Sequence, residues 1–169
     1  MIIIKTFIYI SIFSTATLIG ILLSNKYINR VKELKELKVA LNIFKTKIRF
    51  TSEPLSEIFL EIFNLLKTDV KYIFKNARDN MTIFPAGTAW ENALDECTAS
   101  INNDDKNALK QLGKLLGKTD IDGQISEIEL TETFLNIQII EAEKEKEKNQ
   151  KLYKSLGVIG GLGIVIILL

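Results

Sequence analysis

The stretch TFIYISIFSTATLIGILL, residues 6–23, decides the fold because it contains no charged residue. As an α-helix its eighteen residues extend about 27 Å, close to the roughly 30 Å hydrocarbon core of a bilayer. A cleaved signal peptide is the alternative, with Lys5 as its basic region and residues 14–16 as a small-residue cleavage site. The apolar run continues past that site and reaches polar Ser24 without an A-x-A pattern. The sequence therefore predicts an uncleaved N-terminal transmembrane anchor over residues 1–25.

A second uncharged run, SLGVIGGLGIVIILL, occupies residues 155–169. As a helix it extends about 22 Å, which is short for a transmembrane span. Bilayer thinning, or snorkelling by Lys151 and Lys154, would let it cross, and a re-entrant segment is the alternative. The sequence therefore predicts a short transmembrane or re-entrant segment at the C-terminus.

Small residues recur at four-residue spacing in both runs. Gly157 and Gly161 form a GxxxG pair in the second run, and Ala16 and Gly20 form a matching small pair in the first. Such pairs let membrane helices approach closely. The spacing is therefore compatible with pairing of the two segments.

Basic residues flank the inner ends of both apolar runs. They are Lys26, Arg30, Lys32, Lys35, Lys38, Lys144, Lys146, Lys148, Lys151 and Lys154. Only Lys5 lies on the outer side of either run. Because basic residues collect on the cytoplasmic side of a membrane, we expect residues 26–154 in the cytoplasm. The lone cysteine, Cys97, is compatible with that reducing compartment.

Apolar residues at three- and four-residue steps predict helices throughout residues 26–154, so the expected fold is all-α. The predicted helices cover residues 27–49, 55–66, 68–77, 88–101, 104–116, and about 124 onward into the second apolar run. Trp90 lies on one face of its helix with Ala93, Leu94 and Cys97, which predicts a packing role for the indole and a core position for the thiol.

Capping signals set the expected helix ends. Pro54 suits the first turn of a helix that Ser52 or Glu53 caps. Thr88 and Glu91 have the spacing of a capping box. Residues 102–105, with sequence NNDD, favour another helix start, and Gly117 is a natural C-cap.

The composition excludes several kinds of chemistry. With 22 Lys and Arg against 21 Asp and Glu, the net charge of +1 provides no field that would attract nucleic acid. The chain has no histidine and one cysteine, which excludes Ser-His-Asp and Cys-His catalysis and most zinc sites. It contains no P-loop, GxGxxG or CxxC motif. The sequence therefore predicts no catalytic residue, cofactor or metal.

Two features leave alternatives open. Acidic residues such as Asp69 with Asp79, or those at 104–105 with 120–122, are the raw material of a carboxylate site, although capping accounts for them. Gly113 and Gly117 are spaced either for a helix crossing inside the domain or for contact with a partner helix.

Four short motifs occur in a fixed order: PLSE at 54–57, AWE at 89–91, LGKLLGKTD at 112–120 and KSLG at 154–157. In order and spacing they resemble the stage III sporulation protein AB family over nearly the whole chain. The resemblance implies an endospore-forming bacterium, expression in the mother cell, the outer forespore membrane as location, and membership of the channel complex that links mother cell and forespore. It supplies no catalytic residue.

The same resemblance implies a helical domain similar to the cytoplasmic domains of type II secretion and type IV pilus platform proteins, hence a bundle of about six helices. The expected function is a non-enzymatic platform that binds membrane lipid, an assembly ATPase and other channel subunits, and self-association is compatible with it. A platform subunit of another secretion or pilus system is the alternative, and a membrane-tethered carboxylate enzyme is the less favoured one. The partner-contact candidates are Ser56, Glu57, Gly113, Lys114, Gly117 and Lys118.

Overall fold

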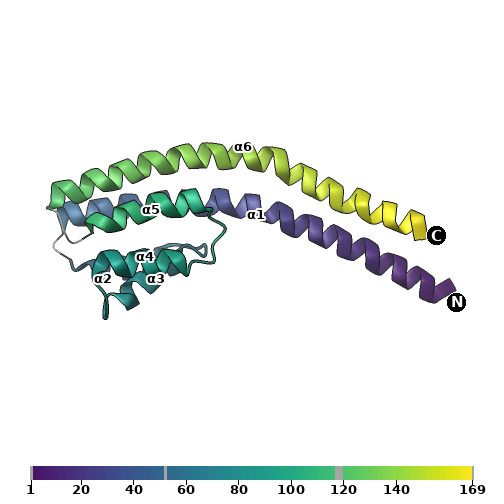
Figure 1. The fold of residues 1–169 in the computed structure, drawn as a ribbon, viewed down its shortest axis with the longest axis horizontal. Coiled ribbons are helices and arrows are strands. Elements are labelled where there is room, and N and C mark those ends of the chain that lie inside the picture. The colour runs from purple at the N-terminus through teal and green to yellow at the C-terminus, as the bar shows by residue number, and fades with distance from the viewer. Residues whose placement is uncertain (1, 52, 117–119, 169) are drawn as a thin grey trace. The chain divides into compact units, whose positions relative to one another are not determined.

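A computed structural model describes residues 2–51, 53–116 and 120–168, and every regular element within these ranges is an α-helix. The helices are α1 Ile2–Phe50, α2 Leu55–Leu65, α3 Lys71–Asn80, α4 Ala86–Asp95, α5 Asn103–Leu115 and α6 Ile121–Leu168 (Figure 1). The predicted all-α fold with long apolar terminal helices is confirmed.

The contacts divide the chain into two compact units. We call residues 2–31 with 141–168 the hairpin unit, and Lys32–Ile140 the bundle unit. Helices α1 and α6 each contribute to both units, because each continues without a break from its apolar run into its polar stretch. The predicted membrane borders at residues 25 and 154 concern the bilayer and stay predictions.

Four aromatic side chains form the centre of the bundle unit. Phe59 contacts Phe44, Phe74 and Trp90, with ring centroids 5.5, 5.5 and 5.6 Å away respectively. Phe74 and Trp90 also meet edge to face at 5.4 Å. All four rings are at most 1% exposed. Tilted and edge-on pairs at these distances add to the free energy gained by burying each ring.

Trp90 also fixes the crossing of α4 over α5. Its indole Nε1 donates a hydrogen bond of 2.7 Å to the carbonyl of Leu109, which satisfies the one polar group of the ring. A Cβ on Gly87 would collide with the carbonyl of Gly113, and a Cβ on Gly113 would lie 2.6 Å from Trp90 Cδ1. Gly113 is therefore a buried residue at a helix crossing inside the domain, and the predicted packing role of Trp90 is confirmed.

Two carboxylates on α1 hold loops of the bundle unit in place. Oε2 of Glu36 accepts hydrogen bonds from the backbone amides of Lys67 and Thr68 and from the Thr68 hydroxyl, at 3.0, 2.8 and 2.8 Å. Glu33, which is 4% exposed, accepts the amide of Ser100. Burial raises the pKa of Glu33 above its ordinary value, and the Ser100 bond opposes that rise.

Several predicted helix ends are wrong, because packing overrides local signals. α4 begins at Ala86 behind extended Pro85, without a side-chain cap, so Thr88 is not the N-cap. It ends at Asp95 instead of residue 101, and Cys97 therefore lies beyond the helix in the segment that leads to Ser100.

Of the other predicted helix ends, some are wrong and one is confirmed. Pro54 is the N-cap residue of α2, and no side-chain hydrogen bond caps this helix. The Glu53 carboxylate instead accepts hydrogen bonds from Lys47 Nζ at both of its oxygens. Ser52 lies outside the described residues. α3 begins at Lys71 rather than Thr68, whose amide and hydroxyl bind Glu36. The predicted cap at residues 102–105 is confirmed: Asn102 and Asp105 form a reciprocal capping box. Gly117 lies outside the described residues.

We predict that Trp90→Ala lowers the free energy of unfolding of the fragment 26–154 by about 3–5 kcal/mol, because a fully buried ring is replaced by a cavity. Urea denaturation followed by circular dichroism measures the change. Ile83→Ala is the control, since Ile83 is 76% exposed and its loss should change the free energy by less than about 0.5 kcal/mol. Equal effects of the two substitutions would contradict a central role for the indole.

Candidate functional site

The two helices of the hairpin unit touch through small residues. A Cβ on Gly20 would lie 2.6 Å from the Tyr153 carbonyl oxygen and 2.9 Å from Gly157 Cα. One turn further along, a Cβ on Gly161 would lie 3.1 Å from Ala16 Cβ. A side chain at Gly20 would collide with the backbone of α6, and one at Gly161 would require its neighbours on α1 to shift. The matching small pairs of the sequence therefore meet in one interface.

Contacts on either side of this interface extend the same antiparallel register. The Tyr9 hydroxyl donates to the carbonyl of Leu168 at 2.8 Å, and the rings of Tyr27 and Tyr153 stack with centroids 5.7 Å apart. The short C-terminal run thus lies beside residues of α1 from Tyr9 onward. The Tyr9 bond also satisfies one of the carbonyls that the end of α6 leaves without an intrahelical partner.

A charged pair lies at the polar end of the hairpin unit. Arg30 Nη1 donates to Glu145 Oε2 at 2.8 Å, and the Arg30 side chain is only 8% exposed. Sequence spacing did not reveal this pair, because its members are more than a hundred residues apart in the chain. The signal that could have suggested the pair was Arg30 itself, an isolated arginine on the face of α1 that meets another helix.

The outer faces of the hairpin unit are apolar and uncovered. Both α1 and α6 are long and apolar enough to cross a membrane, and within the apolar window of each only 6% of residues are buried. Helices of a soluble core would be mostly buried, so these windows do not belong to such a core. Cleavage after residue 16 would remove Ala16, which packs against Gly161 of α6. The structure therefore suggests membrane association of both segments.

The partner-contact candidates do not form one cluster. Ser56 is half-buried and Glu57 is exposed in the first turn of α2, whereas Lys114 is exposed near the end of α5. In Figure 1 the start of α2 and the end of α5 lie toward the same end of the bundle unit. Gly113 is buried against Gly87 and Trp90, and Gly117 and Lys118 lie outside the described residues. Their role in partner contact stays a prediction.

The acidic candidates are dispersed among local roles. Asp69 precedes α3 and Asp79 lies in its last turn, so the two are separated by the length of the helix. The Asp105 carboxylate belongs to the capping box of α5, and Asp120 accepts the amide of Gly123 at 2.9 Å at the start of α6. Among the described residues, no group of three or more acidic or cysteine side chains is placed to hold a metal ion.

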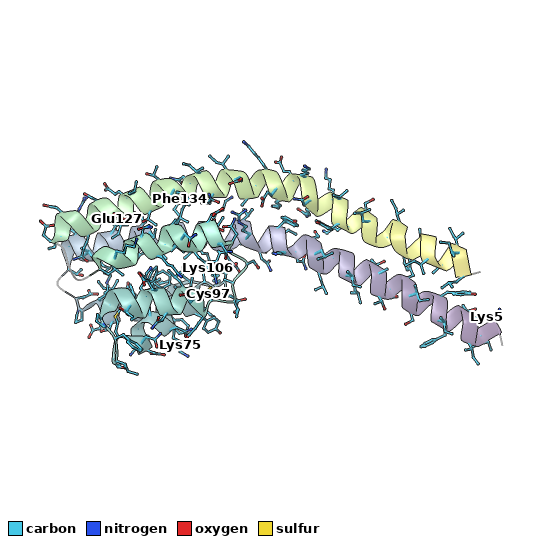
Figure 2. All side chains as sticks on the ribbon, viewed as in Figure 1. Lys5, Lys75, Cys97, Lys106, Glu127 and Phe134 are labelled. Atoms are coloured by element: carbon cyan, nitrogen blue, oxygen red, sulfur yellow. The ribbon has the colours of Figure 1, made fainter. Side chains whose placement is uncertain are left out.

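Cys97 is half-buried, and its environment favours the neutral thiol. Its Sγ accepts the amide of Ala99 at 3.4 Å, and burial raises the pKa of the thiol above its ordinary value. Lys106, which donates to the Cys97 carbonyl at 3.0 Å, opposes that rise without cancelling it (Figure 2). A raised pKa lowers the thiolate fraction that a nucleophile needs.

Comparison with known proteins gives one consistent result. A family model described as stage III sporulation protein AB matches residues 5–169. The stage III sporulation protein AB of Bacillus subtilis (strain 168) is 30% identical over 154 residues, which cover 89% of this chain and 90% of that protein. A solved structure of a stage III sporulation protein AB superposes with a TM-score of 0.67 at 27% identity, covering 71% of this chain and 98% of the other.

We predict that Gly157→Leu separates the two helices of the hairpin unit, whereas Gly160→Leu does not. A Cβ on Gly160 meets nothing within 4 Å, so that substitution is a matched control on the same helix. Overpacking costs about 1–3 kcal/mol, which lowers the paired population roughly tenfold.

The readout is crosslinking of Tyr27→Cys to Tyr153→Cys by a short bis-maleimide, in a Cys97→Ser chain. Proteolysis within the bundle unit followed by electrophoresis distinguishes crosslinks within one chain from those between chains. Equal crosslinking of the two leucine variants would show that the glycine contact does not hold the hairpin together.

Proposed function

This chain belongs to the stage III sporulation protein AB family, which confirms the resemblance of its four motifs, and from this premise we propose that it is a non-enzymatic membrane platform. The proposed platform is a subunit of a secretion-like channel complex between mother cell and forespore. Its bundle unit faces the mother-cell cytoplasm and engages an assembly ATPase and other channel subunits.

The glycine-mediated pairing of the terminal helices is the observation that carries this proposal. Two membrane helices that pack backbone to backbone form a more rigid anchor than two independent spans, and both connect directly to helices of the bundle unit. A rigid anchor is what a platform requires, because force applied to its soluble part must not simply reorient it. The apolar outer faces of the pair supply the lipid contact.

The orientation rests on the basic residues that flank the inner ends of the apolar runs. Lys26 and Lys154 are exposed at these borders, and the stacked rings of Tyr27 and Tyr153 lie beside them. Basic and aromatic residues are typical of a membrane interface, with the basic excess on the cytoplasmic side. This pattern supports a cytoplasmic bundle unit.

Engagement of an ATPase follows from what the chain would need for mechanical work. The sequence has no phosphate-binding loop, so energy must enter through contact with a protein that has one. The end of the bundle unit where α2 begins and α5 ends supports such a contact, because it exposes charged residues of both signs, including Glu57 and Lys114. Exposed charges of this kind steer association and set its specificity.

The proposed orientation predicts which cysteines react in intact cells. In a Cys97→Ser chain, Ile83→Cys should react with a membrane-impermeant maleimide only after the membrane is opened, since residue 83 is highly exposed and on the cytoplasmic side. Lys5→Cys should be labelled in cells whose outer surface alone is accessible. The opposite pattern would invert the orientation and exclude a cytoplasmic ATPase as partner.

The proposed ATPase contact predicts a loss of binding on charge reversal. Lys114→Glu, alone and together with Lys118→Glu, should reduce co-purification of the assembly ATPase from sporulating cells by about fivefold or more and lower the spore count. The melting temperature should not change, because exposed charges contribute little to stability. Lys75→Glu is the control, since Lys75 is exposed on α3 (Figure 2). Normal capture and sporulation in the double variant would exclude this surface as the docking site.

A further inference from the structure

A groove between α5 and α6 remains uncovered in the bundle unit. It encloses about 550 Å³. Four residues of one α5 face line it, Asp104, Asn107, Ala108 and Gln111, together with five residues of one α6 face, Glu127, Leu130, Thr131, Phe134 and Gln138. The spacing on each helix is three or four residues, so both walls are continuous helix faces. Of the partner-contact candidates within the described residues, Ser56, Glu57, Gly113 and Lys114, none lines it.

The floor of the groove is apolar and accessible. Leu130 is 63% exposed, and Phe134 and Ala108 are half-buried. The Thr131 hydroxyl donates a hydrogen bond to the Glu127 carbonyl at 2.9 Å, so its proton is already bonded within α6. Leu130 and Phe134 thus offer apolar contact surface inside a concave groove, where a bound molecule can bury it.

The charged groups lie at the two ends of the groove. α5 and α6 run antiparallel (Figure 1), so Asp104 at the start of α5 lies near Gln138, while Glu127 lies at the opposite end. Gln138 follows Glu127 by eleven positions on α6, which is about 17 Å or three helical turns. Among the described residues that line the groove there is no Lys or Arg, so its field is negative at both ends.

We propose that this groove binds an amphipathic helix of a partner protein that carries apolar side chains in its centre and a basic residue at each end. The α6 wall is about three turns long and the α5 wall about two, so a helix laid between them can pack its ridge into the groove. The basic residues pair with Asp104 and Glu127, and apolar anchors one turn apart cover Leu130 and Phe134. The negative ends favour this occupant over a helix with an acidic rim, which would be repelled.

The test uses the full chain in discs of zwitterionic lipid and two fluorescein-labelled sixteen-residue peptides. The first peptide has arginine at its third and fourteenth positions and leucine at its seventh and tenth, all on one helix face. The second has glutamate in place of both arginines. We expect saturable binding of the arginine peptide by fluorescence anisotropy and none by the glutamate peptide, with empty discs setting the background.

Matched variants locate the binding surface. Leu130→Ala should weaken binding about tenfold, as loss of an interface anchor does. Ile137→Ala should have no effect, because Ile137 is similarly exposed on the same helix but does not line the groove. Asp104→Asn with Glu127→Gln should weaken binding about fivefold at low salt, and salt should abolish that difference by screening.

Four outcomes would overturn the proposal. They are the absence of saturable binding, equal binding of both peptides, equal loss in the Leu130 and Ile137 variants, and dimerisation of the chain that Leu130→Ala abolishes. The last outcome, seen by analytical ultracentrifugation, would show that a second copy of the chain occupies the groove instead.

Discussion

The contact between Gly20 and Gly157 sets the register on which the rest of the hairpin unit depends. In lipid, apolar side chains gain little by leaving their solvent for one another, so close backbone packing decides how two helices pair. Once these glycines meet, Ala16 lies opposite Gly161 and Tyr9 opposite Leu168. The register thereby places the shorter apolar run of α6 beside the longer apolar run of α1.

The bundle unit follows the rule of an aqueous solvent, in which apolar burial decides the fold. Its aromatic centre is the contact of Phe59 with Phe44, Phe74 and Trp90, and nearby polar side chains bond to the backbone. The Trp90 indole donates a hydrogen bond to the Leu109 carbonyl. The Glu36 carboxylate accepts the Thr68 amide in the segment before α3. Each polar contact fixes a crossing or a loop whose position apolar packing alone leaves loose. The resulting unit presents helix ends and the α5–α6 groove on its surface.

Sequence patterns predicted which segments are helical, because an apolar face repeats every three or four residues whatever it packs against. They failed at helix ends such as those of α4. There the helix begins before the capping signal at Thr88, and Gly87 packs against Gly113. That crossing joins residues far apart in the chain, and no local pattern contains it. The spacing of small residues in both apolar runs was compatible with the hairpin contact but did not by itself predict it. The α5–α6 groove was not, since its two walls become one surface only after folding.

Glu33 combines an electrostatic cost of burial with a role in positioning the backbone of the bundle unit. Its pKa is raised, so between the ordinary value of 4.5 and the raised one the folded chain binds more protons than the unfolded chain. The contribution of Glu33 to stability is therefore greatest in acid and falls as the pH rises through that window. At neutral pH the buried carboxylate opposes folding, yet it accepts the Ser100 amide and so fixes the segment between α4 and α5. The Asn102–Asp105 capping box then begins α5 directly after this segment, so a carboxylate on α1 helps to position one wall of the groove.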